Sequence, residues 1–143
     1  MGASNGHVEV KRGAGTYRVI RSHRDMDVYR NAVDSAMEIF RATRAFPREE
    51  VYSLTSQILR SSRSVAANFV EAWRKRRYEA AFVAKLSDAE SEAAETQVHL
   101  EFAVKCGYLT RERGAELYRK YERLIRTLVG MIQHADRWLI NSK

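Results

Sequence analysis

The stretch that decides the fold is residues 82–103, FVAKLSDAESEAAETQVHLEFA. Small and apolar residues recur in it at alternating spacings of three and four. Because an α-helix has about 3.6 residues per turn, this spacing places them on one face, as in the seam between packed helices. The stretch therefore predicts a long helix within a bundle. The seam residues are Phe82, Leu86, Ala89, Ala93, Thr96, Leu100 and Ala103.

The residues that follow predict where this helix ends and the next begins. Gly107 can take the left-handed backbone conformation that ends many helices, and Tyr108 can fold back as the apolar partner of such a cap. Thr110 is a residue type that commonly caps a helix N-terminus. A further helix is therefore expected, with the apolar stripe Leu117, Tyr121, Leu124, Leu128, Ile132, Ala135 and Leu139.

Two more helices are expected before residue 82. The first spans residues 25–44, where Ser22 and Asp25 approximate a capping box. The second is expected to begin at Pro47, because proline suits the first turn of a helix. The apolar stripe of this second helix is Val51, Leu54, Ile58, Ser61 or Ser62, Val65, Phe69 and Ala72.

The sequence indicates the boundary between the second and third helices less clearly than any other boundary. Residues 73–79 contain no proline or glycine, so the pattern is also compatible with one continuous helix. We favour a turn at residues 76–78, because four consecutive basic side chains repel one another in a helix and the apolar stripes need antiparallel neighbours. The sequence thus predicts an all-α, up-down-up-down antiparallel four-helix bundle over residues 25–143.

Residues 1–24 are expected to form a flexible basic leader. Four of the seven glycines lie there, and no apolar period extends through the segment. It also lacks the apolar region of a secretory signal, and no later stretch is long and apolar enough to cross a membrane. These features indicate a cytoplasmic protein without a membrane partner.

Charge makes nucleic acid a candidate partner. The chain has 25 Lys and Arg against 18 Asp and Glu, a formal net charge of +7. Basic groups beside aromatic residues can contact phosphates and stack on bases, and Trp73 and Tyr78 flank a basic run; a solvated loop is the alternative. The candidate nucleic-acid-binding residues are Arg60, Arg63, Arg74, Lys75, Arg76 and Arg77. A second basic face is Arg119, Lys120, Arg123 and Arg126.

A polar stripe follows the second predicted helix beside its apolar one. It can be an exposed face, a structural network of hydrogen bonds between helices, or a ligand site. Its residues are Gln57, Ser61, Ser64, Asn68 and Glu71. The third helix is acidic, which predicts pairing with basic helices of the same subunit or of a neighbour. Its acids include Asp88, Glu90, Glu92 and Glu95.

The sequence contains no recognised motif for catalysis or metal binding. There is no Glu-x-x-His motif, and the set of Glu92, Glu95 and His99 has no counterpart on another predicted helix. No Gly-x-Ser-x-Gly or phosphate-binding glycine loop occurs. The one cysteine, Cys106, is expected to pack as a small apolar side chain. We therefore expect no enzyme activity, no metal and no cofactor.

Four segments together resemble a known family. They are Phe46-Pro47, QILRSSRSVAANFVE at 57–71, KLSDAESEAAETQ at 85–97, and Cys106 to Leu109. Over residues 24–140 the chain is similar to the four-helix bundle proteins encoded in intervening sequences of bacterial large-subunit ribosomal RNA genes. Ala72 departs from the family pattern, which commonly has glycine there.

The resemblance implies a bacterial, cytoplasmic protein that forms a ring-like homopentamer and binds RNA or partner proteins. Together with the basic surfaces, the resemblance gives our leading hypothesis. The protein is expected to be a non-enzymatic, oligomeric protein that contacts nucleic acid, with RNA as the first candidate. The alternative is a homo-oligomeric protein-interaction scaffold with no nucleic-acid role.

Overall fold

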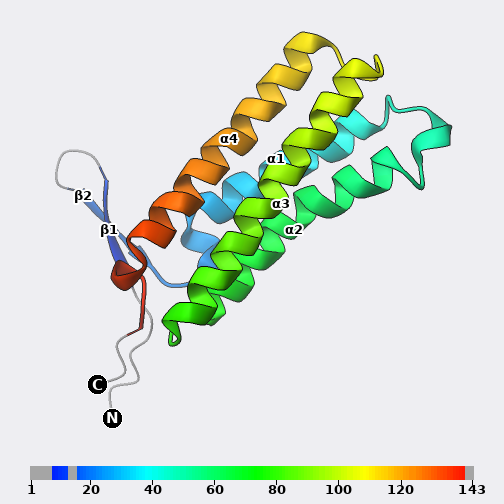
Figure 1. Ribbon diagram of the computed structural model, residues 1–143. Helices are drawn as coiled ribbons and strands as arrows, with labels where there is room; N and C mark the ends of the chain where they lie inside the picture. The colour runs from blue at the N-terminus through cyan, green and yellow to red at the C-terminus, as the bar shows by residue number, and fades with distance from the viewer. Residues whose placement is uncertain (1–7, 13–15, 141–143) are drawn as a thin grey trace.

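Four helices form the body of the protein, whose computed structural model describes residues 8–12 and 16–140 (Figure 1). Each helix packs against the next in the chain, and the first also packs against the fourth, so the four run alternately up and down. The predicted fold class is confirmed. The helices are α1 (Asp27–Thr43), α2 (Leu54–Arg74), α3 (Glu79–Lys105) and α4 (Arg111–Gln133).

The predicted seam of α3 is the centre of the core. All seven of its residues are buried, and they lie against equally buried side chains of the other helices. Burying a large apolar side chain contributes roughly 1.5–3 kcal/mol, so this seam supplies much of the driving force for folding. Among the described residues, no helix is long and apolar enough to cross a membrane.

The end of α3 has the predicted cap. Gly107 has a φ of 79°, its N–H donates to the carbonyl of Val104 at 3.0 Å, and the N–H of Tyr108 reaches back to Ala103 at 2.8 Å. This is the Schellman arrangement, which satisfies two carbonyls at the helix end. Thr110 then caps α4, because its hydroxyl oxygen accepts from the Arg113 N–H at 3.1 Å.

The predicted start of the second helix at Pro47 is wrong. Pro47 precedes a 3₁₀ turn, Arg48–Glu50, and α2 begins only at Leu54 because the backbone of Ser53 is not helical (φ −131°, ψ −110°). Val51, expected on the buried stripe, is exposed. The apolar residues of this connection, Val51 and Tyr52, are exposed, so no buried stripe extends α2 back toward Pro47.

The first helix also starts later than predicted. Ser22 and Asp25 do form a capping box, but it caps a 3₁₀ turn, His23–Asp25, and α1 begins at Asp27. The predicted turn between the second and third helices is confirmed, since residues 75–78 lie between α2 and α3. After α4, the chain ends its described part in a 3₁₀ turn, Ala135–Arg137.

A β-hairpin lies in the segment that we expected to be a leader without regular structure. Strands β1 (Val8–Arg12) and β2 (Thr16–Ile20) pair antiparallel, with Val8 opposite Ile20, at the end of the bundle where α4 ends (Figure 1). Ile20 is fully buried in the hydrophobic core. β-Branched residues favour strands, whereas the expectation of a flexible leader rested on the glycines and on the lack of a sustained apolar period. The other leader residues, 1–7 and 13–15, lie outside the described residues, as do residues 141–143.

Candidate nucleic-acid interface

The basic run forms the turn between α2 and α3, but its four side chains do not share one environment. Arg74, Lys75 and Arg77 are exposed, whereas Arg76 is only 5% exposed. Three of the four cations can therefore meet a phosphate backbone directly.

Arg76 is a structural residue. Its Nε–H donates to the carbonyl of Trp73 at 2.9 Å, its guanidinium carbon lies 3.7 Å from the centre of the Trp73 ring, and its Nη1 lies 3.5 Å from the carbonyl of Trp138. Burial, helped by the charge of Arg74, lowers the pKa of Arg76 to about 10, so it stays charged at neutral pH. Arg76 is therefore not among the cations that this structure exposes to a polyanion.

The two aromatic residues beside the run also differ. Trp73 is 3% exposed and packs its ring 6.1 Å from those of Phe69 and Trp138. Tyr78 is 69% exposed. Only Tyr78 can offer a ring face to an unpaired base, whereas Trp73 belongs to the core.

The chain just before α1 adds basic groups to this surface. The His23 ring meets the Tyr29 ring edge-on at 4.8 Å, and burial together with the charges of Arg24 and Arg74 lowers the pKa of His23. Arg24 and Arg74 thus lie near the same imidazole although they are far apart in the sequence. Arg21 and Arg24 are exposed. Sequence reasoning missed these residues because it assigned them to the leader.

We call this surface the basic end: Arg21, His23, Arg24, Arg74, Lys75 and Arg77. It lies where α1 begins and α2 ends, and Figure 1 shows that α3 begins and α4 ends at the same side. Four acids lie close to these cations: Asp25 and the exposed Asp27 where α1 begins, and the exposed Glu79 and Asp136 on α3 and the last 3₁₀ turn. The arrangement offers several cations, with limited neutralisation, to a polyanion.

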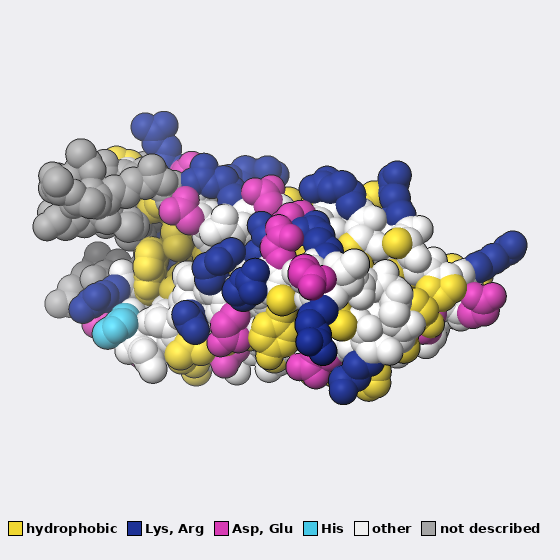
Figure 2. All heavy atoms as spheres, turned by 90° about the horizontal axis from the view of Figure 1, so that it is seen from above, with side chains coloured by type: hydrophobic (Ala, Val, Ile, Leu, Met, Phe, Trp, Pro, Cys, Tyr) yellow, Lys and Arg dark blue, Asp and Glu magenta, His cyan; other side chains and the backbone are white. Residues whose placement is uncertain are grey.

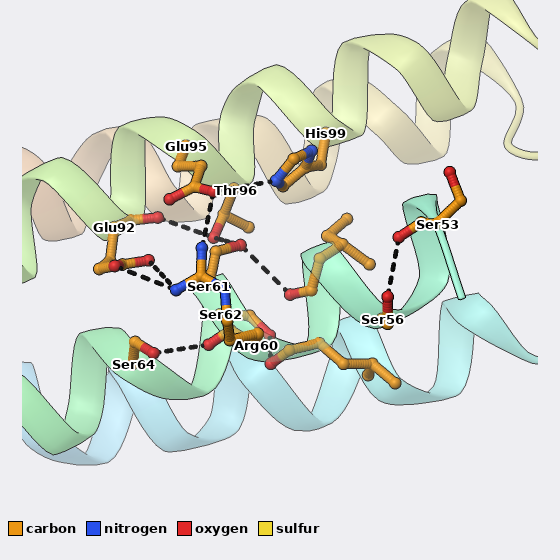
Figure 3. A network of polar contacts seen from close by, with 12 residues as sticks. Ser53, Ser56, Arg60, Ser61, Ser62, Ser64, Glu92, Glu95, Thr96 and His99 are labelled. Carbon is orange, nitrogen blue, oxygen red and sulfur yellow. Dashed lines mark hydrogen bonds and ion pairs between the residues drawn. The ribbon is translucent and has the colours of Figure 1, made fainter. Parts of the chain in front are cut away.

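Arg60 is engaged elsewhere. Its guanidinium forms ion pairs with Glu92 at 3.2 Å and Glu95 at 2.7 Å, which join α2 to α3 (Figure 3). Hydrogen bonds to Glu95 and then Glu92 raise the pKa of Arg60. These acids of α3 neutralise a basic residue of the same subunit, one of the two pairings that the sequence left open.

Arg63 lies on the other flank of α2. Its guanidinium carbon is 6.0 Å from the centre of the Phe40 ring of α1, whereas Arg60 faces α3. Eleven residues of helix separate Arg63 from Arg74, a distance of about 16 Å along the axis. Arg60 and Arg63 therefore do not form one continuous surface with the basic end.

The polar stripe of α2 is divided between several roles (Figure 3). Ser61 shares a buried hydrogen bond of 2.8 Å with Thr96 of α3, and Glu71 pairs with Lys85 at 2.8 Å. Ser64 instead donates to the carbonyl of Arg60 in its own helix. The side chains of Gln57 and Asn68 make no hydrogen bond to the residues that the structure describes. Ser61 and Glu71 therefore join α2 to α3, so the network between helices, one of the three alternatives for the stripe, is found at two of its five residues.

The second basic face, on α4, is partly neutralised. Lys120 pairs with Glu38 of α1 at 2.9 Å, and Arg126 lies 4.0 Å from Glu122. Figure 2 shows basic and acidic side chains interspersed along this view of the bundle instead of a field of one sign. This face is a weaker candidate for a polyanion than the basic end.

The histidine and glutamate set of α3 does not make a metal centre. His99 is buried, and its Nε2 lies 3.4 Å from Glu95, whose carboxylate is already held by Arg60 (Figure 3). Within the described part of the chain, no group of three His, Cys, Asp or Glu side chains could hold a metal ion. Cys106, expected to be packed, is exposed.

Comparisons with known proteins point to one family. The sequence model of the family described as "23S rRNA-intervening sequence protein" matches residues 24–130. The crystal structure of a protein with unknown function from the S23 ribosomal protein family of Bacteroides thetaiotaomicron is similar in fold, with a TM-score of 0.67 and 29% sequence identity. The match covers 74% of this chain and 98% of that one. No curated protein sequence matches.

Proposed function

Since this chain belongs to the family of 23S rRNA-intervening sequence proteins, we propose that it is a non-enzymatic, oligomeric protein that contacts RNA through the basic end of its bundle. The proposal places it in the bacterial cytoplasm, where RNA is accessible. Arg74, Lys75 and Arg77 supply the main phosphate contacts, and Tyr78 supplies a stacking surface.

The observation that carries the proposal is the joining of two basic segments at one end of the bundle. The exposed side chains of Arg21 and Arg24, just before α1, and of Arg74, Lys75 and Arg77, at and after the end of α2, lie at the same end of the bundle (Figure 1). Contacts to phosphates do not depend on base sequence, so such a surface favours binding by charge and shape. Arg60 and Arg63 have secondary roles, because one is paired with acids and the other faces away.

Salt dependence tests the proposal directly. Binding of a fluorescent single-stranded RNA of about 20 nucleotides is measured by anisotropy between about 50 and 200 mM salt, where phosphate contacts weaken steeply. The variant Arg74→Gln/Lys75→Gln/Arg77→Gln should bind more weakly, and its slope of log affinity against log salt should fall by about two, at about 0.7 per lost contact.

A matched control removes three exposed arginines elsewhere, Arg41→Gln/Arg44→Gln/Arg123→Gln. It lowers the net charge equally, so it should retain the slope of the wild type if binding is local to the basic end. Equal losses in both triple variants would indicate non-specific attraction and reject the site. Absence of RNA binding by the wild type at low salt would reject the function.

The alternative function, a homo-oligomeric scaffold without nucleic acid, is favoured by a different observation. Val98 and Phe102 are exposed one turn apart on α3, and Val51 and Tyr52 are exposed beyond α1. Large exposed apolar side chains indicate protein contacts. An oligomer that binds neither RNA nor DNA at low salt would support the scaffold over the leading proposal.

A further inference from the structure

The connection between α1 and α2 carries a large aromatic side chain at its apex. Tyr52 is 96% exposed, and Val51 beside it is 45% exposed. We call residues 48–52 the tip. Figure 1 shows the tip projecting from the bundle at the end opposite to the hairpin.

The tip is held firmly to the bundle. The Tyr108 hydroxyl donates to Glu50 Oε2 at 2.9 Å, and the Tyr108 ring lies 5.5 Å from the ring of Phe46. The hydrogen bond attaches Glu50, in the middle of the tip, to the segment that follows α3. Tyr52 is therefore presented to solvent on a fixed support, so docking it costs little conformational entropy.

A groove lies at the same end of the bundle, between the last turns of α3 and the first turns of α4. Its volume is about 530 Å³, which falls in the usual range for binding pockets. Gly114 allows α3 and α4 to approach each other closely at the bottom of the groove, because a Cβ at this position would overlap with Cγ2 of Val104. The apolar floor consists of Leu100, Val104, Gly114, Ala115 and Tyr118.

The rim of the groove is mainly basic. Lys105, Arg111 and Arg119 line it together with one acid, Glu101. The tip carries the exposed pair Arg48 and Glu49 beside its apolar residues. Glu49 can therefore meet a rim cation while Arg48 meets Glu101, and an aromatic ring can fill the apolar floor.

We propose that the tip of one copy of this chain seats in the α3–α4 groove of the next copy, with the Tyr52 ring on the floor beside Ala115. This inference rests on the oligomer in the proposed function and names its contact. The exposed Val98 and Phe102 lie on the same face of α3 as Glu101 and Lys105, and they extend the apolar area next to the groove.

The geometry determines the kind of assembly. Tip and groove are different surfaces of the same chain, so the contact is heterologous, and repeated copies form a ring when the rotation between neighbours closes on itself and a filament when it does not. Both lie at one end of the bundle, so neighbouring copies stand side by side in the same orientation. Every basic end then lies on one face of the ring, where several weak phosphate contacts act together.

Mass measurement by light scattering tests the contact. Tyr52→Ser removes the inserted ring, and Ala115→Arg fills the groove; each should lower the mass from that of the oligomer to that of one chain, 16.5 kDa. Tyr78→Ser is the matched control, since it removes another exposed tyrosine, at the basic end, and should keep the oligomer. Circular dichroism shows whether each variant remains folded.

Disulfide trapping gives a positive test that does not depend on loss of assembly. In a Cys106→Ser background, Tyr52→Cys/Ala115→Cys should form a ladder of covalently linked chains on oxidation. A mixture of the two single-cysteine variants should give linked pairs containing one chain of each kind. Cross-linking that is absent, or a wild type that is monomeric, would overturn the contact.

These outcomes are separate from those of the RNA experiment. A wild type that binds RNA but is a monomer refutes the tip contact and leaves the basic end in place. A chain that assembles through Tyr52 but ignores RNA refutes the proposed function and supports the contact. If both hold, the folded Tyr52→Ser monomer should bind RNA at least tenfold more weakly than the ring, because it has lost multivalency.

Discussion

The guanidinium of Arg76 stacks on the ring of Trp73, with 3.7 Å between its carbon and the ring centre, while its Nε–H bonds the Trp73 carbonyl. A cation thus closes the C-terminal end of α2, where unpaired carbonyls and the helix dipole favour positive charge. This explains why an arginine with no carboxylate partner in the described part of the protein is tolerated in the core.

Replacing this side chain should destabilise the protein. Arg76→Ala removes the stacking, the hydrogen bond and the packing of the aliphatic stem, and we expect a loss of about 2 kcal/mol in the free energy of unfolding. Urea denaturation measures the loss. Arg77→Ala, which removes an exposed neighbour, should change stability by no more than about 0.5 kcal/mol. Equal effects in the two variants would contradict the role of Arg76.

The hydrogen bond between Ser61 and Thr96 should couple α2 to α3. Each of Ser61→Ala and Thr96→Val should cost about 1 kcal/mol, and the double variant should cost less than their sum, since both remove the same bond. Ser64→Ala is the control, because Ser64 bonds only within its own helix. Additive losses would show that the two hydroxyls act independently.

Two glycines should respond to alanine in opposite directions. Gly107→Ala forces a side chain into the left-handed region and should lower stability by about 1 kcal/mol. Gly130 lies within α4 with open space around it, so Gly130→Ala should raise stability by about 0.5–1 kcal/mol. Thermal or urea unfolding of the pair checks both signs. A stabilising Gly107→Ala would contradict the cap at the end of α3.

Tyr108 should make stability fall at alkaline pH. The hydrogen bond to Glu50, with burial as the second cause, raises the pKa of Tyr108 to about 12, above its usual value of 10.0. The unfolded chain then loses this proton first, so the contribution of Tyr108 is complete below pH 10 and declines as pH rises toward 12.

Comparison with Tyr108→Phe isolates this effect from the titration of other groups. The stability difference between the wild type and Tyr108→Phe should shrink over that interval, as measured by urea unfolding at several pH values. Glu50→Gln, which keeps the shape but removes the charge, should move the tyrosine absorbance titration back toward pH 10. A pH-independent difference would show that the hydroxyl has no special partner.

Patterns in the sequence predicted the parts of the fold that depend only on residues close together in the chain. The seam from Phe82 to Ala103 required only helical periodicity, and the cap at Gly107 required only the absence of a Cβ. The start of α2 was missed because Pro47 suits a 3₁₀ turn as well as an α-helix. The hairpin was missed because the glycines of this segment, together with its lack of a sustained apolar period, indicated a flexible chain.

The candidate site was predicted less well, because its chemistry depends on distant partners. Whether Arg76 faces solvent is decided by Trp138, 62 residues later. Arg60 is neutralised by Glu92 and Glu95, which are 32 and 35 residues away. The spacing of residues along one helix does not identify partners on other helices. The number of basic residues therefore overestimated how many cations are available to nucleic acid.

Two contacts of Arg76 depend on residues that are synthesised much later than the basic run. Its carbonyl accepts from the N–H of Ile140, and its side chain approaches the carbonyl of Trp138. A chain emerging from the ribosome exposes the basic run well before those residues are made, and domains fold as their residues become available. Until residues 138–140 have left the ribosome and packed, Arg76 has its contacts with Trp73 but lacks those with Trp138 and Ile140, so the last described segment completes the burial of this cation.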